Sequence, residues 1–374
     1  MKKYRWLTAA LLAAMLGLSA CRAALPEENA SAAEIVEGSA QGTAEGGLPQ
    51  KVENEGSGAQ TPGGSTQQAG STTQPGGQTQ QPGSQTPQTG NSDLPDTSDE
   101  SQNNQNQEET PVEKSYNLKL MAYNIRCAND PNGHSIDERA PRVKQIIAQN
   151  DPDVIGLEEV TPAWMTHLNA DYQDRYSIIQ YYRTAENREG LAILYKKEKY
   201  ELVEEGFFWL SDTPDQESKG WDGDYHRICV WAKLKDKALG KTFVYYAVHL
   251  DGTDTCHLGS YRLNAREIEK NAKFPCFVGG DCNMRIGSAG YTAFLSSMDE
   301  ARDLVSAPTS PSNTCTYAVG YPQIEAQKQD LNAIIDYIFH QENKAAAVDY
   351  QVDQTQVGGR WPSDHFPIIC CYQI

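Results

Sequence analysis

Polar side chains of three chemical kinds recur where the apolar runs of residues 116–374 stop. They are the amides of Asn124 and Asn283, the carboxylates of Glu159, Asp281, Asp336 and Asp364, and the imidazoles of His249 and His365. Such groups bind metal ions and transfer protons, and loops at strand ends are where α/β proteins build their sites. Each residue alone is weakly informative, because Gly280–Asp281 fits a turn, Asp364 fits a cap, and His249 fits a hydrogen-bonded core histidine.

The elements that carry these residues alternate between strand-like and helix-like patterns. Strands are expected at residues 118–125, 153–157, 176–182, 191–195, 228–234, 242–249, 275–278, 334–339 and 367–372. Helices are expected at residues 139–149, from Thr161 onward with Pro162 in the first position, and at residues 258–272. This alternation indicates a mixed α/β fold.

Taken together, the polar residues lie in six segments whose order is informative. The segments are MAYNIR (121–126), DVIGLEEV (153–160), VHLD (248–251), VGGDCN (278–283), IDYI (335–338) and SDHFP (363–367). This ordered set resembles the endonuclease/exonuclease/phosphatase superfamily, and the match spans the domain from end to end. Residues 208–231 resemble an uncharacterised bacterial branch of that family. The resemblance implies a four-layer α/β sandwich of two packed mixed β-sheets, as in DNase I, with the site at one edge.

The resemblance also implies a role for each strand-end residue. Glu159, Asp364 and Asn124 would supply hard oxygen ligands, which suit Mg²⁺ or Mn²⁺. His365 would contact a nonbridging phosphate oxygen, and Asp336 would orient the His365 ring and favour its charged form. Asp281 would position or deprotonate the attacking water, and Asn283 would hold the phosphate.

A second group of residues has less certain roles. His249 matches a family histidine at the phosphate, and Glu189 aligns with the acidic partner of that histidine, with Glu186 as a rival. Arg227 is expected to bind a substrate phosphate as a bidentate donor, although a surface salt bridge explains it equally well. Trp221 either walls the cleft or simply packs.

The sequence departs from the family pattern at two places. Many relatives have glutamine where this chain has Glu158, so an extra carboxylate either lies near the metal or faces away. Neither Arg262 nor Arg266 cleanly matches the arginine that relatives place after the histidine, and a site role for either stays open.

Aromatic residues show how the 374-residue chain is divided. Thirty-one of its 33 aromatic residues lie in residues 116–374, and the other two are Tyr4 and Trp6. Residues 21–115 are rich in Gly, Gln, Thr, Ser and Pro, a composition that cannot bury enough apolar surface to fold and is typical of a linker. We expect one folded domain at residues 116–374.

The first residues predict export and anchoring. A basic start is followed by an apolar run from Leu7 to Ala20 that is too short to cross a bilayer, which is typical of a secretory signal at residues 1–20. The signal ends in LSAC (18–21), which resembles the lipobox of bacterial lipoproteins. Cys21 is therefore expected to be lipidated and to tether the protein to the cell membrane, outside the cytoplasm; the alternative is an ordinary signal peptide with an incidental cysteine.

Charge and cysteine content limit the partners. The chain has a formal charge of −18, and residues 116–374 carry −10, with 26 lysine and arginine residues against 36 acidic ones. This charge disfavours, without excluding, binding to nucleic acid through its phosphates. The eight cysteines after Cys21 have no zinc spacing; most are expected to be core thiols, with room for one disulfide.

The leading hypothesis is a surface-tethered, Mg²⁺-dependent or Mn²⁺-dependent phosphoesterase that attacks phosphorus with water. A small phosphodiester, a phosphorylated sugar or a lipid headgroup suits the acidic domain as substrate. The alternatives are an extracellular nuclease and a non-catalytic binding lipoprotein on the same fold, and the complete catalytic set disfavours the second. Nothing in the sequence indicates an obligate oligomer, and we expect a monomer.

Overall fold

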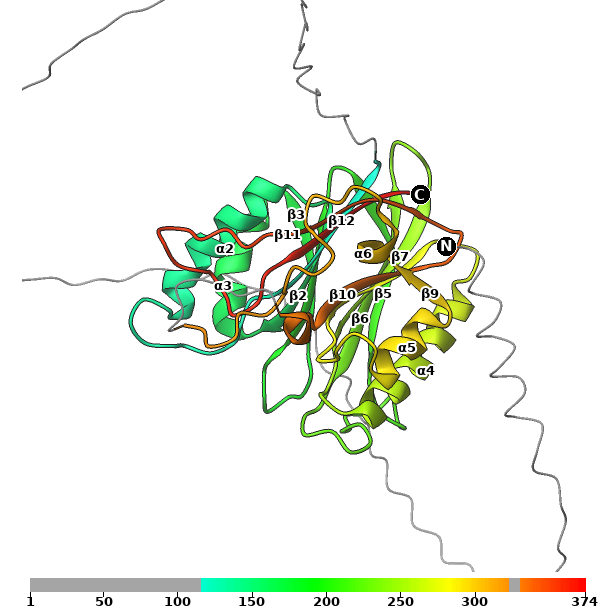
Figure 1. Ribbon diagram of the computed structural model, residues 1–374, viewed down its shortest axis with the longest axis horizontal. Coiled ribbons are helices and arrows are strands. Elements are labelled where there is room, and N and C mark those ends of the chain that lie inside the picture. The colour runs from blue at the N-terminus through cyan, green and yellow to red at the C-terminus, as the bar shows by residue number, and fades with distance from the viewer. Residues whose placement is uncertain (1–115, 323–329) are drawn as a thin grey trace, which may run out of the picture. The chain divides into compact units, whose positions relative to one another are not determined.

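The computed structural model of the protein describes residues 116–322 and 330–374. The expected signal at residues 1–20, the lipidation residue Cys21 and the linker up to residue 115 lie outside these residues. The described strands form two six-stranded sheets, with α2 and α3 on one side and α4 and α5 on the other (Figure 1). This confirms the expected α/β sandwich of two packed mixed sheets.

The first sheet contains both the first and the last strand of the domain. Its order is β11 (Ala346–Val352), β12 (Ile368–Gln373), β1 (Leu118–Asn124), β2 (Val154–Val160), β4 (Gly190–Lys196) and β3 (Tyr176–Tyr182). Strands β1 and β2 are parallel, and their other neighbours are antiparallel. The carboxyl ends of β1 and β2 therefore open on the same edge of the sheet.

The second sheet repeats this arrangement around a different parallel pair. Its order is β5 (Tyr200–Trp209), β6 (Ile228–Asp236), β7 (Thr242–His249), β8 (Cys276–Asp281), β10 (Asp336–Gln341) and β9 (Met298–Glu300). Strands β7 and β8 are parallel and the remaining pairs are antiparallel. Each sheet thus has one central pair of strands whose carboxyl ends lie together.

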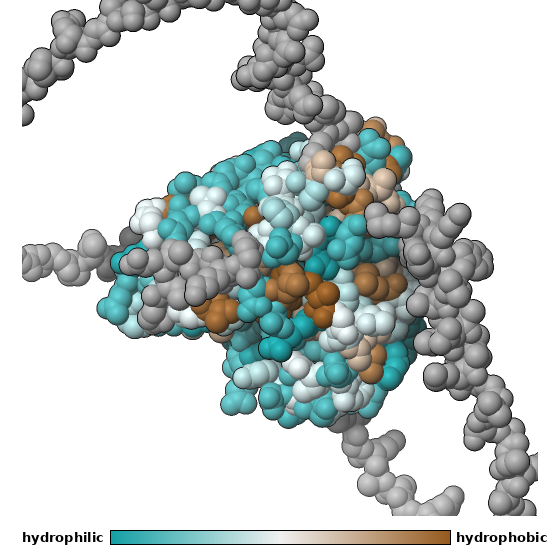
Figure 2. All heavy atoms as spheres, in the orientation of Figure 1, coloured by the Kyte–Doolittle hydropathy of each residue, from teal (hydrophilic) through white to brown (hydrophobic). Residues whose placement is uncertain are grey.

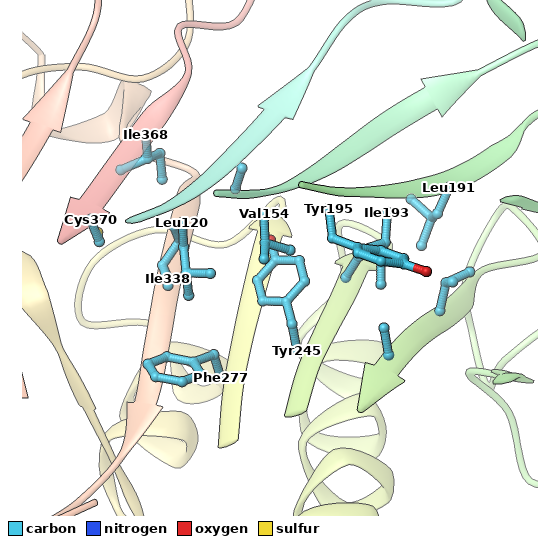
Figure 3. Packing of buried hydrophobic residues seen from close by; sticks show 14 of the residues in the cluster. Leu120, Val154, Leu191, Ile193, Tyr195, Tyr245, Phe277, Ile338, Ile368 and Cys370 are labelled. Carbon is cyan, nitrogen blue, oxygen red and sulfur yellow. The ribbon is translucent and has the colours of Figure 1, made fainter. Parts of the chain in front are cut away.

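Alternation along the strands divides the apolar side chains between two kinds of packing. On β1, Leu118 and Leu120 belong to the core between the sheets, whereas Met121 and Tyr123 belong to the cluster under α2 and α3. Figure 3 shows Leu120 and Val154 of the first sheet facing the side chains of the second. Each fully buried aliphatic side chain contributes about 1.5–3 kcal/mol, so this core holds the two sheets together.

Side-chain caps set the starts of the main helices. These are α2 (Ile136–Asn150), α3 (Pro162–Tyr172) and α4 (Asp254–Lys270), which Ser135, Thr161 and Thr253 cap. The shorter helices are α5 (Ala289–Leu295), α6 (Ala301–Leu304) and the 3-10 turn at Leu331–Ala333. Helices α2 and α4 begin three and four residues earlier than expected, because the capping residues lie further upstream. No helix of the described residues is long and apolar enough to cross a membrane.

The expected core thiols are buried. Of the eight described cysteines, seven are buried and Cys127 is partly exposed, and none of the eight is in a disulfide.

On the face seen in Figure 2, small separate hydrophobic areas lie within a mostly hydrophilic surface. The two ends of the domain are joined, since Asn117 and Ile374 form two hydrogen bonds with each other, of 3.2 and 3.0 Å.

Candidate active site

Strand register places three of the expected site residues in a row across the second sheet. His249, the last residue of β7, lies opposite Asp281, the last residue of β8, and Asp281 lies opposite Asp336, the first residue of β10. His249 Nε2 is 3.4 Å from Asp281 Oδ2. Asp281 belongs to a strand, so the turn that fits Gly280–Asp281 in the sequence is not formed.

His365 joins this row from the loop before β12. Its Nδ1 atom lies 3.0 Å from both carboxylate oxygens of Asp336, and its Nε2 atom lies 3.6 Å from Asp281 Oδ2. Burial by itself lowers the pKa of His365, but the negative charges of Asp336 and Asp281 outweigh burial and raise this pKa well above its usual value. Burial raises the pKa of Asp281 to about 7. His365 and Asp281 therefore combine an imidazolium with a carboxylate that titrates near neutrality.

Thr316 fixes Asp336 behind the imidazole. Its hydroxyl donates to Asp336 Oδ2 at 2.6 Å and accepts from the backbone amide of Asp336 at 3.1 Å. The next residue, Tyr317, lies with its ring centroid 5.0 Å from that of His365. Thr316 and Tyr317 lie in a loop with no strand or motif signal, so the sequence pattern does not indicate a role for them.

The first sheet contributes Asn124 and Glu159, which lie at the carboxyl ends of β1 and β2, to the other side of the site. Glu159 Oε2 accepts from the backbone amide of Cys127 at 2.7 Å, and its Oε1 accepts from Asn124 Nδ2 at 3.1 Å. Burial raises the pKa of Glu159, but these hydrogen bonds outweigh it and the pKa lies below its usual value. Asn124 also donates to Asp281 Oδ2 at 3.0 Å, so it links the two sheets. Its oxygen accepts from the backbone amide of Arg126.

Asp364 lies on the same side of the site and already has a cationic partner. Its Oδ2 atom lies 2.5 Å from Nη1 of Arg126, and Ser363, which donates to the carbonyl of Asn124, also contacts its Oδ1 atom. Arg126 in turn contacts Asp130. A positive charge beside Asp364 is thus part of the site.

Buried Arg139 of α2 holds the two loops on this side of the site together. Its guanidinium donates to backbone carbonyls of Ile125, Arg126 and Ala128 in one loop, and to Pro362 in the other. Burial lowers the pKa of Arg139. The sequence pattern places Arg139 at the start of a helix and does not indicate these contacts with two loops.

The backbone is unusual at three points around the site. Arg126, Glu159 and Asn283 have positive φ angles of 59°, 63° and 48°, which non-glycine residues adopt only when the surroundings hold them. Glu159 lies in the bulge of β2 between Leu157 and Val160, and this bulge turns its side chain toward the site. Gly280 has φ 145°, and a Cβ there would lie 1.9 Å from the carbonyl of Val248.

These residues surround one cleft with a volume of about 560 Å³. Its lining includes Glu159, Glu189, Arg227, His249, Asp281, Asn283, Asp364 and His365 of the expected set, together with Cys127, Arg183, Tyr225, Tyr317 and Ile335. Asn124 and Asp336 lie just behind this lining and are both buried. The structure therefore brings all ten expected catalytic, metal and substrate residues to one place.

Glu189 has a different partner from the expected one. Its Oε2 lies 2.7 Å from Nη2 of Arg183, and no Glu189–His249 hydrogen bond occurs within the residues that the structure describes. Burial, followed by the charges of Arg227, His365 and Arg183, lowers the pKa of His249 well below its usual value, so its ring is neutral. The rival Glu186 is exposed.

Three other residues singled out in the sequence do not line the cleft. The Trp221 ring packs against Gly259 of α4, where an added Cβ would lie 2.2 Å from it, and Trp221 donates to Asp212. Arg262 and Arg266 are exposed on α4. Trp221 is thus a packing residue, and neither arginine has a place in the cleft.

Glu158 faces the core between the sheets, directly beneath the site. It is fully buried, neither carboxylate oxygen has a hydrogen-bond partner, and a Cβ on Gly280 would lie 2.9 Å from its Oε1 atom. Burial, and then the charges of Asp336 and Asp281, raise its pKa well above the usual value. The extra carboxylate therefore faces away from the cleft and is held in its neutral form.

Replacing Glu158 with glutamine should stabilise the protein at neutral and alkaline pH. Because the folded pKa of Glu158 lies above the unfolded one, the unfavourable contribution is absent at acid pH and grows as pH rises above about 4.3. We expect the free energy of unfolding to increase by about 1–3 kcal/mol at pH 8 and by less at pH 4.5, measured by urea denaturation. Glu201→Gln, at an exposed position of β5, is the matched control. A loss of stability at both pH values would contradict a neutral buried acid.

Comparison with known proteins is consistent with this arrangement. The model of the endonuclease/exonuclease/phosphatase family matches residues 121–365. A mannosyl-6-phosphatase from Bacteroides thetaiotaomicron is 26% identical with a TM-score of 0.60, over 69% of this chain and all of that one. Another family protein from the same organism is 27% identical with a TM-score of 0.61, over 68% and 97% of the two chains. An uncharacterised protein of Acanthamoeba polyphaga mimivirus is 28% identical over 36% of this chain, which matches about half (54%) of that protein's length.

Proposed function

The chain belongs to the endonuclease/exonuclease/phosphatase family, and we propose that it is a divalent-metal-dependent hydrolase of phosphoester bonds. The observation that carries this proposal is the row of His249, Asp281 and Asp336, closed by His365, which faces the carboxylates of Glu159 and Asp364 across one cleft. Acid–base groups and hard oxygen ligands thus line the same cleft, and a phosphate in the cleft would lie between them.

Each residue of the row has a task that its surroundings support. Asp281, with a pKa near neutrality, accepts a proton from the attacking water and orients it. The His365 imidazolium, held by Asp336, stabilises the negative charge that develops on a nonbridging oxygen. Neutral His249 donates one hydrogen bond to the phosphate, and Asn283, whose backbone amide donates to Asp281, holds a further oxygen.

Glu159 and Asp364, with Asn124, are the residues that would hold Mg²⁺ or Mn²⁺. Their oxygen donors fit a hard cation, and the Arg126 guanidinium shows that Asp364 accommodates a positive charge. Asp281, Asp336 and His365 also lie within 4.8 Å of one another, but an imidazolium has no lone pair for a metal. When bound there, a divalent cation would supply Lewis-acid polarisation of a phosphoryl oxygen, which contributes several kcal/mol of charge stabilisation.

The substrate we favour is a small phosphoester. Residues 116–374, which contain the described domain, carry a net charge of −10. The cleft volume of about 560 Å³ suits a small molecule. One of the similar structures is a mannosyl-6-phosphatase. A phosphorylated sugar, a small diester and a lipid headgroup all fit these properties. Long nucleic acid fits the charge less well.

The proposal is tested by metal removal combined with a choice of substrates. We expect the purified protein to hydrolyse mannose 6-phosphate or bis(4-nitrophenyl) phosphate, to lose at least about 100-fold in rate in EDTA, and to recover with Mg²⁺ or Mn²⁺. Plasmid DNA is the comparison substrate. Hydrolysis that EDTA leaves unchanged would contradict the metal requirement, and a strong preference for DNA would favour a nuclease instead.

We also propose that the protein is exported and anchored through a lipid on Cys21, with residues 21–115 as the spacer. The support is the basic start, the short apolar run and the lipobox-like LSAC segment. Cys21→Ser should move the protein from the membrane fraction of the producing bacterium to the soluble fraction and remove labelling by a palmitate analogue. Unchanged fractionation of this variant would contradict the anchor.

A further inference from the structure

Two arginines and one tyrosine meet in the cleft, where Glu189 is the carboxylate paired with one of the arginines. Arg183 follows β3 of the first sheet, and Arg227 precedes β6 of the second. Their guanidinium carbons lie 5.4 and 5.1 Å from the ring centroid of Tyr225, and all three residues line the cleft. None of the expected catalytic roles uses this group as a unit.

The surroundings hold the group in place before any ligand binds. Glu189 pairs with Arg183 at 2.7 Å, and the carbonyl of Arg183 accepts from the indole of Trp209. The backbone amide of Tyr225 donates to Asp251 at 2.9 Å, which fixes the loop that leads into Arg227. Preorganised groups lose little entropy when they bind a ligand.

Arg227 lacks a counter-ion of its own. Its Nε atom is buried without a hydrogen-bond partner, and its guanidinium forms no ion pair with any of the described residues. Arg183 has its partner in Glu189, whose own pKa burial raises. Together, Arg183, Arg227 and Glu189 carry one net positive charge, and Arg227 presents it to the cleft.

We propose that Arg183, Arg227 and Tyr225 form a second anion subsite, which takes a phosphate group of the substrate other than the one that is cleaved. The inference rests on the proposed phosphoesterase function and specifies its substrate class. Arginine forks bind phosphate oxygens in bidentate geometry. Arg183, Arg227 and His249 also line a small pocket whose lining does not include Asp281. The preferred substrate is therefore a phosphoester with a neighbouring phosphate, either a small bisphosphate or a phosphorylated nucleotide chain.

Binding of inorganic anions tests the subsite without any turnover. Isothermal titration of the full chain in EDTA should show at least tenfold tighter binding of pyrophosphate than of phosphate. Arg227→Met and Arg183→Met should each reduce that ratio to near one, while Arg266→Met, at an exposed position of α4, should leave it unchanged. Circular dichroism checks that each variant is folded. If Arg183→Met unfolds, because Arg183 is buried, the Arg227→Met variant alone provides the test. Equal affinities in the unaltered protein would overturn the subsite.

Turnover of matched substrate pairs then identifies the source of the second phosphate. One pair is mannose 6-phosphate and mannose 1,6-bisphosphate, and the other is the 5′-(4-nitrophenyl phosphate) of thymidine with and without a 3′-phosphate. We expect kcat/KM with Mg²⁺ to favour the member with the second phosphate by at least tenfold in one pair, and Arg227→Met to remove that preference. Equal rates within both pairs overturn the subsite and leave the phosphoesterase standing. No hydrolysis of any of them, alongside tight pyrophosphate binding, overturns the proposed function and keeps the subsite.

Discussion

Asp281→Asn is expected to lower kcat by about 10³-fold while leaving the fold intact. The carboxylate lies within 3.6 Å of groups from both sheets, namely Asn124, His249 and His365, and it is the residue placed to accept the proton of the attacking water. General base catalysis contributes about 10²–10⁴-fold, and an amide cannot provide it. Steady-state kinetics with saturating Mg²⁺ measures the loss.

The same substitution carries a signature in stability. Burial raises the folded pKa of Asp281, so its unfavourable contribution is absent below its unfolded pKa and grows as pH rises toward about 7. Asp281→Asn should therefore raise the melting temperature at pH 8 while it removes activity. Asp299→Asn, on the edge strand β9, is the matched control and should change neither quantity. A kcat near that of the unaltered enzyme would show that another group handles the water.

Asp336→Asn is expected to lower kcat by about 10²-fold and to narrow the pH range of activity. Asp336 holds the Nδ1 atom of His365, and removing one donor to a developing negative charge costs about 10²–10³-fold. Activity that needs the imidazolium is complete below the raised pKa of His365 and is lost as pH rises through it. With one stabilising charge removed, this pKa falls, so the alkaline limb of the kcat profile should move to lower pH.

Thr316→Val provides a graded comparison for this prediction. It removes the 2.6 Å hydrogen bond to the Asp336 carboxylate, together with the bonds that the hydroxyl accepts from the backbone amides of Ile335 and Asp336, and keeps both charges of the pair. We expect a smaller loss of kcat and little movement of the alkaline limb. If Asp336→Asn lowers kcat with an unmoved pH profile, Asp336 supports the structure without setting the charge of His365.

Part of the fold could be predicted because burial leaves a regular pattern. Strands β3 and β7 have the expected bounds, and both carry apolar residues that pack in the core. The missed strands lack that pattern: β5 has three exposed residues in its first half and a bulge, β11 is a bulged edge strand, and β9 has three residues. Their pairing depends on neighbours distant in the chain, which local sequence does not report.

The site, too, has residues that the sequence predicts and contacts that it does not. Residues at strand ends were found because parallel pairs bring carboxyl ends together, as with Asn124 and Glu158 on one pair and His249 and Asp281 on the other. The structure pairs Glu189 with Arg183, whereas the resemblance pairs it with His249. The choice between these partners depends on side-chain geometry, which local sequence does not report. Arg183 itself follows an apolar strand, so the rule that located the other residues also applies to it.

The joined ends of the domain have a practical consequence for handling the enzyme. Leu118 begins β1 opposite Tyr372 of β12, whereas the site lies at the other end of β1, beyond Asn124. Seven strand residues at about 3.3 Å each separate the two by roughly 20 Å. A sensor chip, bead or fusion partner attached at Ile374 therefore lies at the end of the sheet away from the cleft. We expect the immobilised enzyme to stay accessible to dissolved substrate.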